Sequence, residues 1–286
     1  MTDKKEIRKI GVLGCGLMGS GIAQVAASNG YEVVVMEINE EVLNKGLGRI
    51  TKNLDRMVSK GRLSDAGKDE IMGRLSGTRQ LADLAGSDMV IEAVVENLDI
   101  KQDIWRKLDQ LCPSNTIFAS NTSSLKISLQ AEATSRGDRF VGLHFFNPVP
   151  MMKLVEVIRT DETSDETHAA AMDFSRALGK DPITCVDSTG FVVNRLLTPY
   201  LLDAVRALER GIASVEDIDK AMRLGCGHPM GPLALMDFIG LDTVLYISNI
   251  MLEEFGEPSC APPKLLSEMV SQGKLGKKSG QGFYSY

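Results

Sequence analysis

A glycine motif near the N-terminus, G-C-G-L-M-G, lies between an apolar strand-like segment, residues 10–13, and a helix-like run, residues 20–27. Gly14 permits the tight turn, Gly16 lets the backbone approach a pyrophosphate, and Gly19 lets the helix pack closely on a sheet. The N-terminus of the helix offers N–H groups and a positive dipole to the phosphates. Because such a turn needs a strand before it and a helix after it, the placement of the motif favours a βαβ nucleotide-binding unit in this part of the chain.

A second strand is predicted at residues 31–36, and it ends at Glu37. A carboxylate about 20 residues beyond a glycine motif can accept hydrogen bonds from the hydroxyls of an adenosine ribose. The same charge would repel a 2′-phosphate, so NAD is favoured and NADP is disfavoured. The competing interpretation is an ordinary glycine turn followed by a surface glutamate.

Strands and helices continue to alternate beyond this unit. Strands are predicted at residues 88–94 and 116–119, on either side of an amphipathic helix at residues 98–111. The alternation predicts a parallel, doubly wound sheet whose ligand crevice lies beyond the carboxyl ends of the strands. The loops that follow the strands should open on this crevice, which would make Ser123 and His144 neighbours.

Two strand-like segments each place one ionisable residue among apolar neighbours: His144 in G-L-H-F-F-N-P and Glu156 in L-V-E-V-I. If the two strands are adjacent, the carboxylate can fix the tautomer of the imidazole and raise its basicity. The histidine would then be a general acid/base near neutral pH. Structural burial of both residues is the competing interpretation of this pair taken alone.

The chain has 286 residues, a formal net charge of -6, and a composition that is 43% hydrophobic and 24% charged. These values are ordinary for a soluble globular protein, and the negative charge argues against general nucleic-acid binding. No apolar run approaches the roughly 20 residues that span a membrane, and the charged residues 1–6 do not resemble a signal peptide. Five scattered cysteines lack the spacing of a metal site or disulfide framework, which predicts reduced thiols, no metal and a cytoplasmic protein.

A basic stripe interrupts the acidic chain, with residues that would share one face of a helix: Lys45, Arg49, Lys52, Arg56 and Lys60. One interpretation is a solvated helix face. The other is an anchor for the anionic, phosphate-bearing tail of a substrate.

The last third of the chain lacks strand-like alternation. A linker is predicted at residues 187–190, a long helix at residues 192–209, and a further helix with a capping-box-like start at Ser214. We therefore expect an α/β protein: a Rossmann-like NAD-binding domain, residues 1–187, followed by a smaller all-helical domain, residues 188–286. The apolar faces of the helical domain suggest a dimer interface.

Several motifs occur together in an order that is specific. The glycine motif, A-S-N-T-S-S at residues 119–124, H-F-F-N-P at residues 144–148 and G-F-V-V-N-R at residues 190–195 strongly resemble those of the 3-hydroxyacyl-CoA dehydrogenases. The chain is similar to the short monofunctional 3-hydroxybutyryl-CoA dehydrogenases in particular. H-P-M-G-P at residues 228–232 and the terminal G-K-K-S-G-Q-G-F-Y extend the resemblance over essentially the whole chain.

The resemblance implies a role for each residue that matches a family motif. By it, His144 matches the catalytic base and Glu156 its partner. Ser123 matches the serine at the 3-oxygen of the substrate, and Asn194 the asparagine near its carbonyl group. Cofactor contacts are implied for Gly14, Gly16, Leu17, Met18, Gly19, Glu37, Glu96, Lys101, Asn147 and Lys278. Contacts with coenzyme A are implied for Asn53, Arg56 and Lys60. The chain departs from the common family pattern at Glu37, where aspartate is usual, and at Asn53, where serine also occurs.

The resemblance also implies an activity: NAD-dependent interconversion of (S)-3-hydroxyacyl-CoA and 3-ketoacyl-CoA, with 3-hydroxybutyryl-CoA and acetoacetyl-CoA as the expected pair. It implies a homodimer formed through the C-terminal domain and a place in fatty acid or butyrate metabolism. Two alternatives stay open: a dehydrogenase of the same scaffold that acts on 3-hydroxyadipyl-CoA or a free sugar acid, and a non-catalytic binding paralogue. The basic stripe favours an acyl-CoA over a free acid, and the intact catalytic residues argue against the paralogue.

Overall fold

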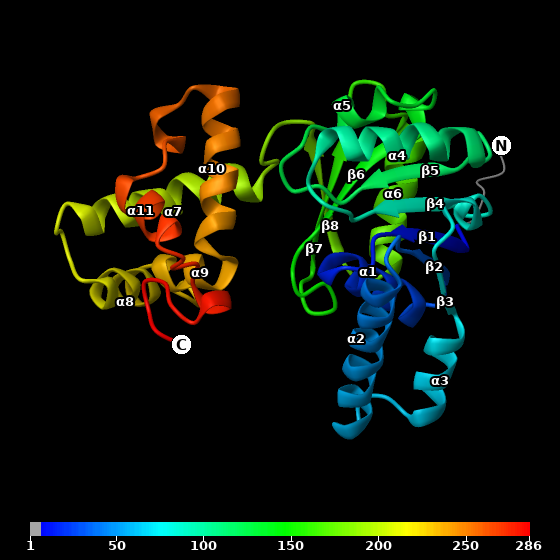
Figure 1. Cartoon of the computed structure of the whole chain (residues 1–286), viewed down its shortest axis with the longest axis horizontal. Coiled ribbons are helices and arrows are strands. Elements are labelled where there is room, and N and C mark those ends of the chain that lie inside the picture. Colours follow the sequence, from blue (N-terminus) through cyan, green and yellow to red (C-terminus); the bar gives the residue numbers. More distant parts are fainter. Residues whose placement is uncertain (1–6) are drawn as a thin grey trace. The chain divides into compact units, whose positions relative to one another are not determined.

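The computed structural model describes residues 7–286. The charged segment at residues 1–6, on which the prediction about a signal peptide rests, lies outside the described residues. Contacts between residues divide the chain into two compact units, Met1–Asp187 and Ser188–Tyr286. Figure 1 shows the elements of each unit.

The first unit is built on one sheet of eight strands, in the order β3-β2-β1-β4-β5-β6-β7-β8. The strands are β1 (Lys9–Leu13), β2 (Glu32–Met36), β3 (Leu75–Thr78), β4 (Met89–Glu92), β5 (Ile117–Ser120), β6 (Phe140–Phe145), β7 (Leu154–Arg159) and β8 (Asp181–Val186). The chain reverses its direction of travel across the sheet between β1 and β4. A ligand crevice is expected beyond the carboxyl ends of strands at such a switch point.

The sheet is mixed rather than wholly parallel, so the prediction of a parallel sheet was wrong for its last two strands. β1 to β6 run parallel to one another, whereas β7 pairs with β6 in the antiparallel sense, and β8 is parallel to β7. The reason is the short connection between Phe145 and Leu154. A parallel pair needs a crossover of a dozen or more residues, and this loop is long enough only for a reversal.

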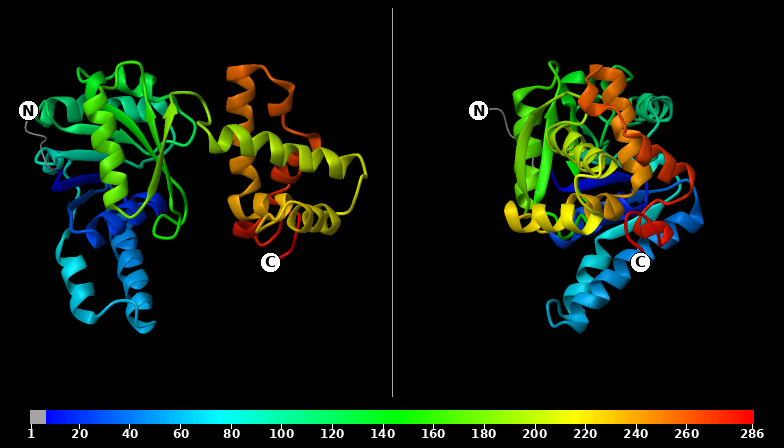
Figure 2. Two further views of the ribbon diagram at one scale, coloured as in Figure 1. Left: turned by 180° about the vertical axis from the view of Figure 1, so that it is seen from behind. Right: turned by 90° about the vertical axis from the view of Figure 1, so that its left-hand side faces the viewer.

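Helices cover both faces of the sheet. They are α1 (Leu17–Ser28), α2 (Glu40–Ser59), α3 (Asp65–Gly73), α4 (Leu98–Leu111), α5 (Ile127–Ala131) and α6 (Asp165–Ala177). Figure 1 is seen from the side of α4, and the view from behind in Figure 2 brings α6 to the front. Trp105 of α4, which is fully buried, packs against Phe118 of β5 and Phe140 of β6 with ring centroids 5.0 Å and 4.9 Å apart. Aromatic packing of this kind anchors α4 over the strands that lead into the candidate site.

The second unit is helical in the described residues, and the predicted fold class is confirmed. Its main helices are α7 (Val193–Glu209), α8 (Val215–Gly225), α9 (Pro232–Ile239), α10 (Leu241–Phe255) and α11 (Lys264–Ser271). The predicted cap at Ser214 is present, because its hydroxyl accepts a hydrogen bond from the N–H of Asp217 at 3.1 Å. A separate apolar core includes Leu202, Leu233 and Leu266.

Within residues 7–286, no single helix has both the length and the apolar character needed to cross a membrane. Only the bent pair of α9 and α10, which meet at 96°, would qualify by length and composition.

Candidate active site

The glycine motif forms the predicted turn between β1 and α1. Gly14 has φ +93°, and a Cβ there would lie 2.6 Å from the carbonyl oxygen of Ala93. A Cβ at Gly19 would lie 1.9 Å from the carbonyl oxygen of Gly14, whereas one at Gly16 would meet nothing within 4 Å. Gly14 and Gly19 are thus required by the fold, while Gly16 borders open space into which a ligand can come close to the backbone.

The start of α1 is suited to an anion. Its N-cap is Gly16, no side chain caps it, and the first turn, which includes Leu17 and Met18, contains no acidic residue. The N–H groups of this turn and the helix dipole can therefore be offered to a pyrophosphate. A cavity of about 760 Å³ opens beside the motif. Its lining includes Gly14, Gly16 and Glu37, so the residues present fit a dinucleotide.

Glu37 lies at the far end of β2, one residue beyond Met36. Its carboxylate accepts a hydrogen bond from the N–H of Cys15 at 3.0 Å, which holds it beside the glycine motif. Burial and the Glu37 carboxylate together raise the pKa of the Cys15 thiol to about 11, so this thiol is neutral at physiological pH. Arg79, which follows β3, lines the same cavity. The cavity thus contains both a carboxylate and a guanidinium at the end predicted to hold the adenosine ribose.

His144 and Glu156 face each other across the antiparallel pair of β6 and β7. The Nδ1 atom of His144 lies 2.6 Å from Oε2 of Glu156. His144 is 6% exposed and Glu156 is fully buried. An ionised carboxylate only accepts hydrogen bonds, so Nδ1 carries a proton in this contact, and Nε2 is the ring nitrogen available for proton transfer in the neutral imidazole.

Ser123 lies in the loop after β5, which runs beside β6. Glu96, in the loop after β4, organises this loop: its Oε1 accepts hydrogen bonds from the N–H of Ser123 at 3.1 Å and the N–H of Ser124 at 3.3 Å. The same oxygen also accepts hydrogen bonds from the hydroxyl groups of Thr122 and Ser124. A single carboxylate thus fixes the loop that carries the predicted substrate-binding serine.

Two residues near this loop were missed by the sequence analysis. Glu92, at the end of β4, is fully buried and lies 2.6 Å from Nζ of Lys101. Asn121 accepts a hydrogen bond from the N–H of Phe145 at 2.9 Å through its Oδ1 atom, which ties the loop of Ser123 to the strand of His144. A lone acidic residue inside an apolar strand is a signal that could have identified Glu92, because the same signal identified Glu156.

Acid should weaken the contacts of Glu96. Burial would raise the pKa of this carboxyl group, but the Lys101 ammonium and the hydroxyls of Thr122 and Ser124 outweigh burial and hold the pKa below its usual value. A lowered carboxyl pKa stabilises the folded state above the unfolded pKa of about 4.3, and this stabilisation is lost as the pH falls through the folded pKa. The thermal midpoint of the wild type should therefore fall more steeply below about pH 5 than that of Glu96→Gln. Thermal unfolding followed by circular dichroism across this pH range tests this prediction. Equal pH dependence of the thermal midpoint in the two proteins would contradict it.

Other predicted site residues lie around these groups. Lys101, in the first turn of α4, is 1% exposed and pairs with both Glu92 and Glu96. Asn147 is exposed, two residues beyond the end of β6, and its peptide bond to Pro148 is cis.

The basic stripe lies on α2 and its C-cap residue, Lys60, but it is not uniform. Arg49 does not belong to a solvated face, because its guanidinium donates to the carbonyl oxygen of Gly16 at 2.9 Å and to the hydroxyl of Ser20 at 2.9 Å. Asn53 donates to the side chain of Gln24 at 3.1 Å. The remaining basic residues of the stripe are exposed: Lys45, Lys52, Arg56 and Lys60. α2 is thus fastened to α1 by Arg49 and Asn53, and it presents the other cations to solvent.

Two predicted site residues belong to the helical unit. Asn194 is half-buried in the first turn of α7, three residues after Phe191, whose φ of +47° is unusual for a residue other than glycine. Strained backbone of this kind often accompanies a functional position. Lys278 is exposed and pairs with Asp242 at the start of α10.

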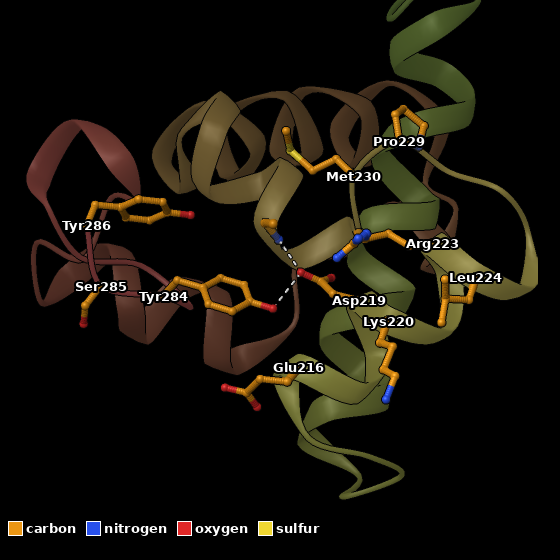
Figure 3. Close-up of a pocket in the computed structure, with 12 residues that line it drawn as sticks. Glu216, Asp219, Lys220, Arg223, Leu224, Pro229, Met230, Tyr284, Ser285 and Tyr286 are labelled. Carbon is orange, nitrogen blue, oxygen red and sulfur yellow. Dashed lines mark hydrogen bonds between the residues drawn. The ribbon is translucent and has the colours of Figure 1, made fainter.

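The helical unit also contains a cavity of about 740 Å³ (Figure 3). None of the predicted site residues lines this cavity. Its buried residue Asp219 accepts hydrogen bonds from the N–H groups of Leu233 and Ala234 at the start of α9, and from the hydroxyl of Tyr284. Asp219 is thus fully used in joining α8, α9 and the C-terminal segment.

Comparison with protein families matches both units. The model described as 3-hydroxyacyl-CoA dehydrogenase, NAD binding domain, matches residues 9–188, and the model described as 3-hydroxyacyl-CoA dehydrogenase, C-terminal domain, matches residues 190–286.

Individual relatives match over nearly the full chain. The human mitochondrial hydroxyacyl-coenzyme A dehydrogenase is 49% identical over 98% of this chain and 91% of its own length. A 3-hydroxybutyryl-CoA dehydrogenase of Mycobacterium tuberculosis is 49% identical over 98% of this chain and 99% of its own. Among solved structures, the (S)-3-hydroxybutyryl-CoA dehydrogenase PaaH1 of Ralstonia eutropha is 48% identical, with a TM-score of 0.95 over 98% of this chain and 99% of its own.

Proposed function

Because this chain belongs to the 3-hydroxyacyl-CoA dehydrogenase family, we propose that it interconverts (S)-3-hydroxybutyryl-CoA and acetoacetyl-CoA with NAD as its cofactor. The observation that carries the proposal is the contact of 2.6 Å between His144 and Glu156. The pair lies on β6 and β7, and β6 pairs with β5, whose following loop carries Ser123. Relatives of nearly equal length carry the name 3-hydroxybutyryl-CoA dehydrogenase, which supports the short acyl chain.

The proposed mechanism assigns the proton to His144. In the oxidative direction, Nε2 of His144 accepts the proton of the 3-hydroxyl group, and in the reductive direction the same atom returns it to the developing alkoxide. Glu156 holds the proton on Nδ1 and stabilises the imidazolium that forms. Ser123 orients the 3-oxygen by a hydrogen bond, and Asn194 orients the carbonyl region of the substrate. The bound nicotinamide supplies the hydride chemistry.

The other predicted cofactor residues are proposed to bind the pyrophosphate, the adenosine ribose and the nicotinamide. Leu17 and Met18 would donate hydrogen bonds from their backbone N–H groups to the pyrophosphate, and Glu37 would bind the adenosine ribose. Glu96, Lys101, Asn147 and Lys278 are proposed to contact the nicotinamide and its ribose.

The carboxylate of Glu37 should set the preference for NAD. In Glu37→Ala the ribose hydroxyls lose a charged acceptor, worth about 1.5–3 kcal/mol, so the KM for NADH should rise about 10-fold or more. The repulsion of a 2′-phosphate disappears and Arg79 remains in the cavity, so kcat/KM for NADPH should increase. Steady-state kinetics with both cofactors provide the measurement. Glu41→Ala, an exposed change in the same region, is the control, and an unchanged preference in Glu37→Ala would contradict the assignment.

The exposed cations of α2 are proposed to bind the phosphates of coenzyme A, with Arg56 and Lys60 as the charged contacts and Asn53 as a polar one. Their exposure supports this role, because a flexible cation can reach a phosphate without first breaking a buried pair. The contact of Asn53 with Gln24 means that its amide would have to be shared or released.

We also propose that the enzyme is a cytoplasmic homodimer that associates through the helical unit. Large apolar side chains on its surface support an interface: Leu196, Ile212 and Leu224 are 70%, 70% and 74% exposed. No disulfide joins any of the five cysteines, all of which lie in the described residues, and this suits a reducing compartment. Light scattering of the purified protein tests the dimer.

The substrate class can be tested in one assay of NADH absorbance. We expect acetoacetyl-CoA to be reduced with a kcat/KM well above that for longer 3-ketoacyl-CoAs and at least about 100-fold above that for free acetoacetate, since the free acid lacks the phosphates that α2 would bind. Equal activity on free acetoacetate would favour a dehydrogenase of a free hydroxy acid. Binding of NADH without turnover of any compound would favour a non-catalytic paralogue.

A further inference from the structure

A closed ring of polar contacts joins the ends of β4 and β5 to the first turn of α4. Lys101 Nζ lies 2.6 Å from Oε1 of Glu92 and 3.1 Å from Oε2 of Glu96. Glu96 accepts a hydrogen bond from the hydroxyl group of Thr122. The N–H of Thr122 donates to the hydroxyl oxygen of Ser120 at 3.3 Å, and the Ser120 hydroxyl donates to Oε2 of Glu92 at 2.7 Å. The ring therefore returns to the residue from which it started.

The ring is buried on the side of Glu92. Glu92 and Ser120 are fully buried, and Lys101 is 1% exposed. Both oxygens of Glu92 are used, since Oε1 also accepts the N–H of Val94 at 2.7 Å. Buried charges are costly unless they are paired and hydrogen-bonded. Loss of the Glu92 charge would leave Lys101 with Glu96 as its remaining acidic partner in the ring.

Glu96 is also the residue that holds the loop of Ser123, through the N–H groups of Ser123 and Ser124. We propose that Glu92 is a positioning residue for the proposed dehydrogenase: it fixes Lys101, Lys101 fixes Glu96, and Glu96 fixes Ser123 at the 3-oxygen of the substrate. The inference rests on the proposed function. It assigns to Glu92 no contact with substrate or cofactor.

The other end of α4 supplies a matched control. Asp109, near the C-terminus of α4, pairs with the largely buried Arg136 at 2.6 Å. This pair ties α4 to the segment before β6, and it has no part in the ring. Asp109→Asn thus removes one charge from a buried pair on the same helix without touching the loop of Ser123.

The test compares Glu92→Gln with Asp109→Asn in the full chain. Glutamine keeps the shape of the side chain but removes the charge and replaces one acceptor by a donor. In Glu92→Gln we expect kcat for acetoacetyl-CoA reduction, measured at saturating NADH, to fall about 10-fold or more. Asp109→Asn should lower the melting temperature and leave kcat within about 2-fold of the wild type. Equal kcat values for the two variants, at similar losses in melting temperature, would overturn the proposal.

A second readout separates this proposal from the proposed function. Hydrogen exchange of the Ser123 and Ser124 amides should accelerate in Glu92→Gln and stay slow in Asp109→Asn, whether or not the protein reduces acetoacetyl-CoA. If the wild type has no activity while the exchange pattern is as expected, the proposed function fails and the positioning role of Glu92 stands. Should Glu92→Gln not fold, Ser120→Ala, which removes only one hydroxyl of the ring, replaces it. Unchanged exchange in that variant would overturn the proposal.

Discussion

His144→Gln should lose about 10²–10⁴-fold in kcat, the usual contribution of a general acid/base. Glutamine can still lie beside Glu156, but its amide does not exchange a proton with an alcohol near neutral pH. The glycine motif and Glu37 are untouched, so the Kd for NADH should stay within about 2-fold of the wild type. Stopped-flow measurement of hydride transfer, together with fluorescence titration of NADH, provides both values.

His168 offers a control of the same residue type in the same unit. It lies on α6, and its Nε2 atom is 3.0 Å from the hydroxyl of Thr184. His168→Gln should leave kcat unchanged. A His144→Gln enzyme that keeps more than about a tenth of the wild-type turnover would remove His144 from the mechanism.

Glu156→Gln should reduce kcat nearly as much as His144→Gln, because it changes the tautomer of His144. A carboxylate accepts the proton of Nδ1, whereas the NH₂ group of glutamine can donate to Nδ1 and so favour the tautomer with its proton on Nε2. That imidazole cannot accept a proton from the 3-hydroxyl group. We expect kcat for oxidation of 3-hydroxybutyryl-CoA to fall by about 100-fold or more.

Because Glu156 is fully buried, its substitution can also destabilise the folded protein. The loss of kcat must therefore be distinguished from a loss of folded enzyme. Single-turnover rates measured well below the melting temperature of the variant separate the two, and Asp109→Asn again supplies a buried-pair control. If Glu156→Gln oxidises substrate at a rate close to that of Asp109→Asn, Glu156 is only a structural partner.

The elements around the cofactor crevice could be predicted from the sequence because each carries a local signal. The glycine motif needs a strand and a helix on either side, and Glu37 follows the next strand. β3 carried no such signal: Ser76 and Gly77 disfavour a strand, and its side chains are largely exposed. Only pairing with β2 makes it a strand.

The arrangement of the two halves of the candidate site was harder to predict. His144 and Glu156 stood out as lone ionisable residues on apolar strands, but the alternation of strands and helices suggested parallel pairing. The loop between β6 and β7 is too short for a parallel crossover, so its length indicates that the two strands are antiparallel. The roles of Glu92 and Asn121 depend on which side chains meet between β4, β5 and β6. No periodicity in the sequence reports such contacts.

We propose that hydride and proton transfer to a 3-ketoacyl-CoA takes place at this site. The most direct measurement mixes the wild-type protein with NADH and acetoacetyl-CoA and follows both NADH absorbance and the chirality of the product. We expect NADH to be consumed in a one-to-one ratio with formation of (S)-3-hydroxybutyryl-CoA. Tight binding of NADH with no consumption of it in the presence of any 3-ketoacyl-CoA would contradict the proposed function.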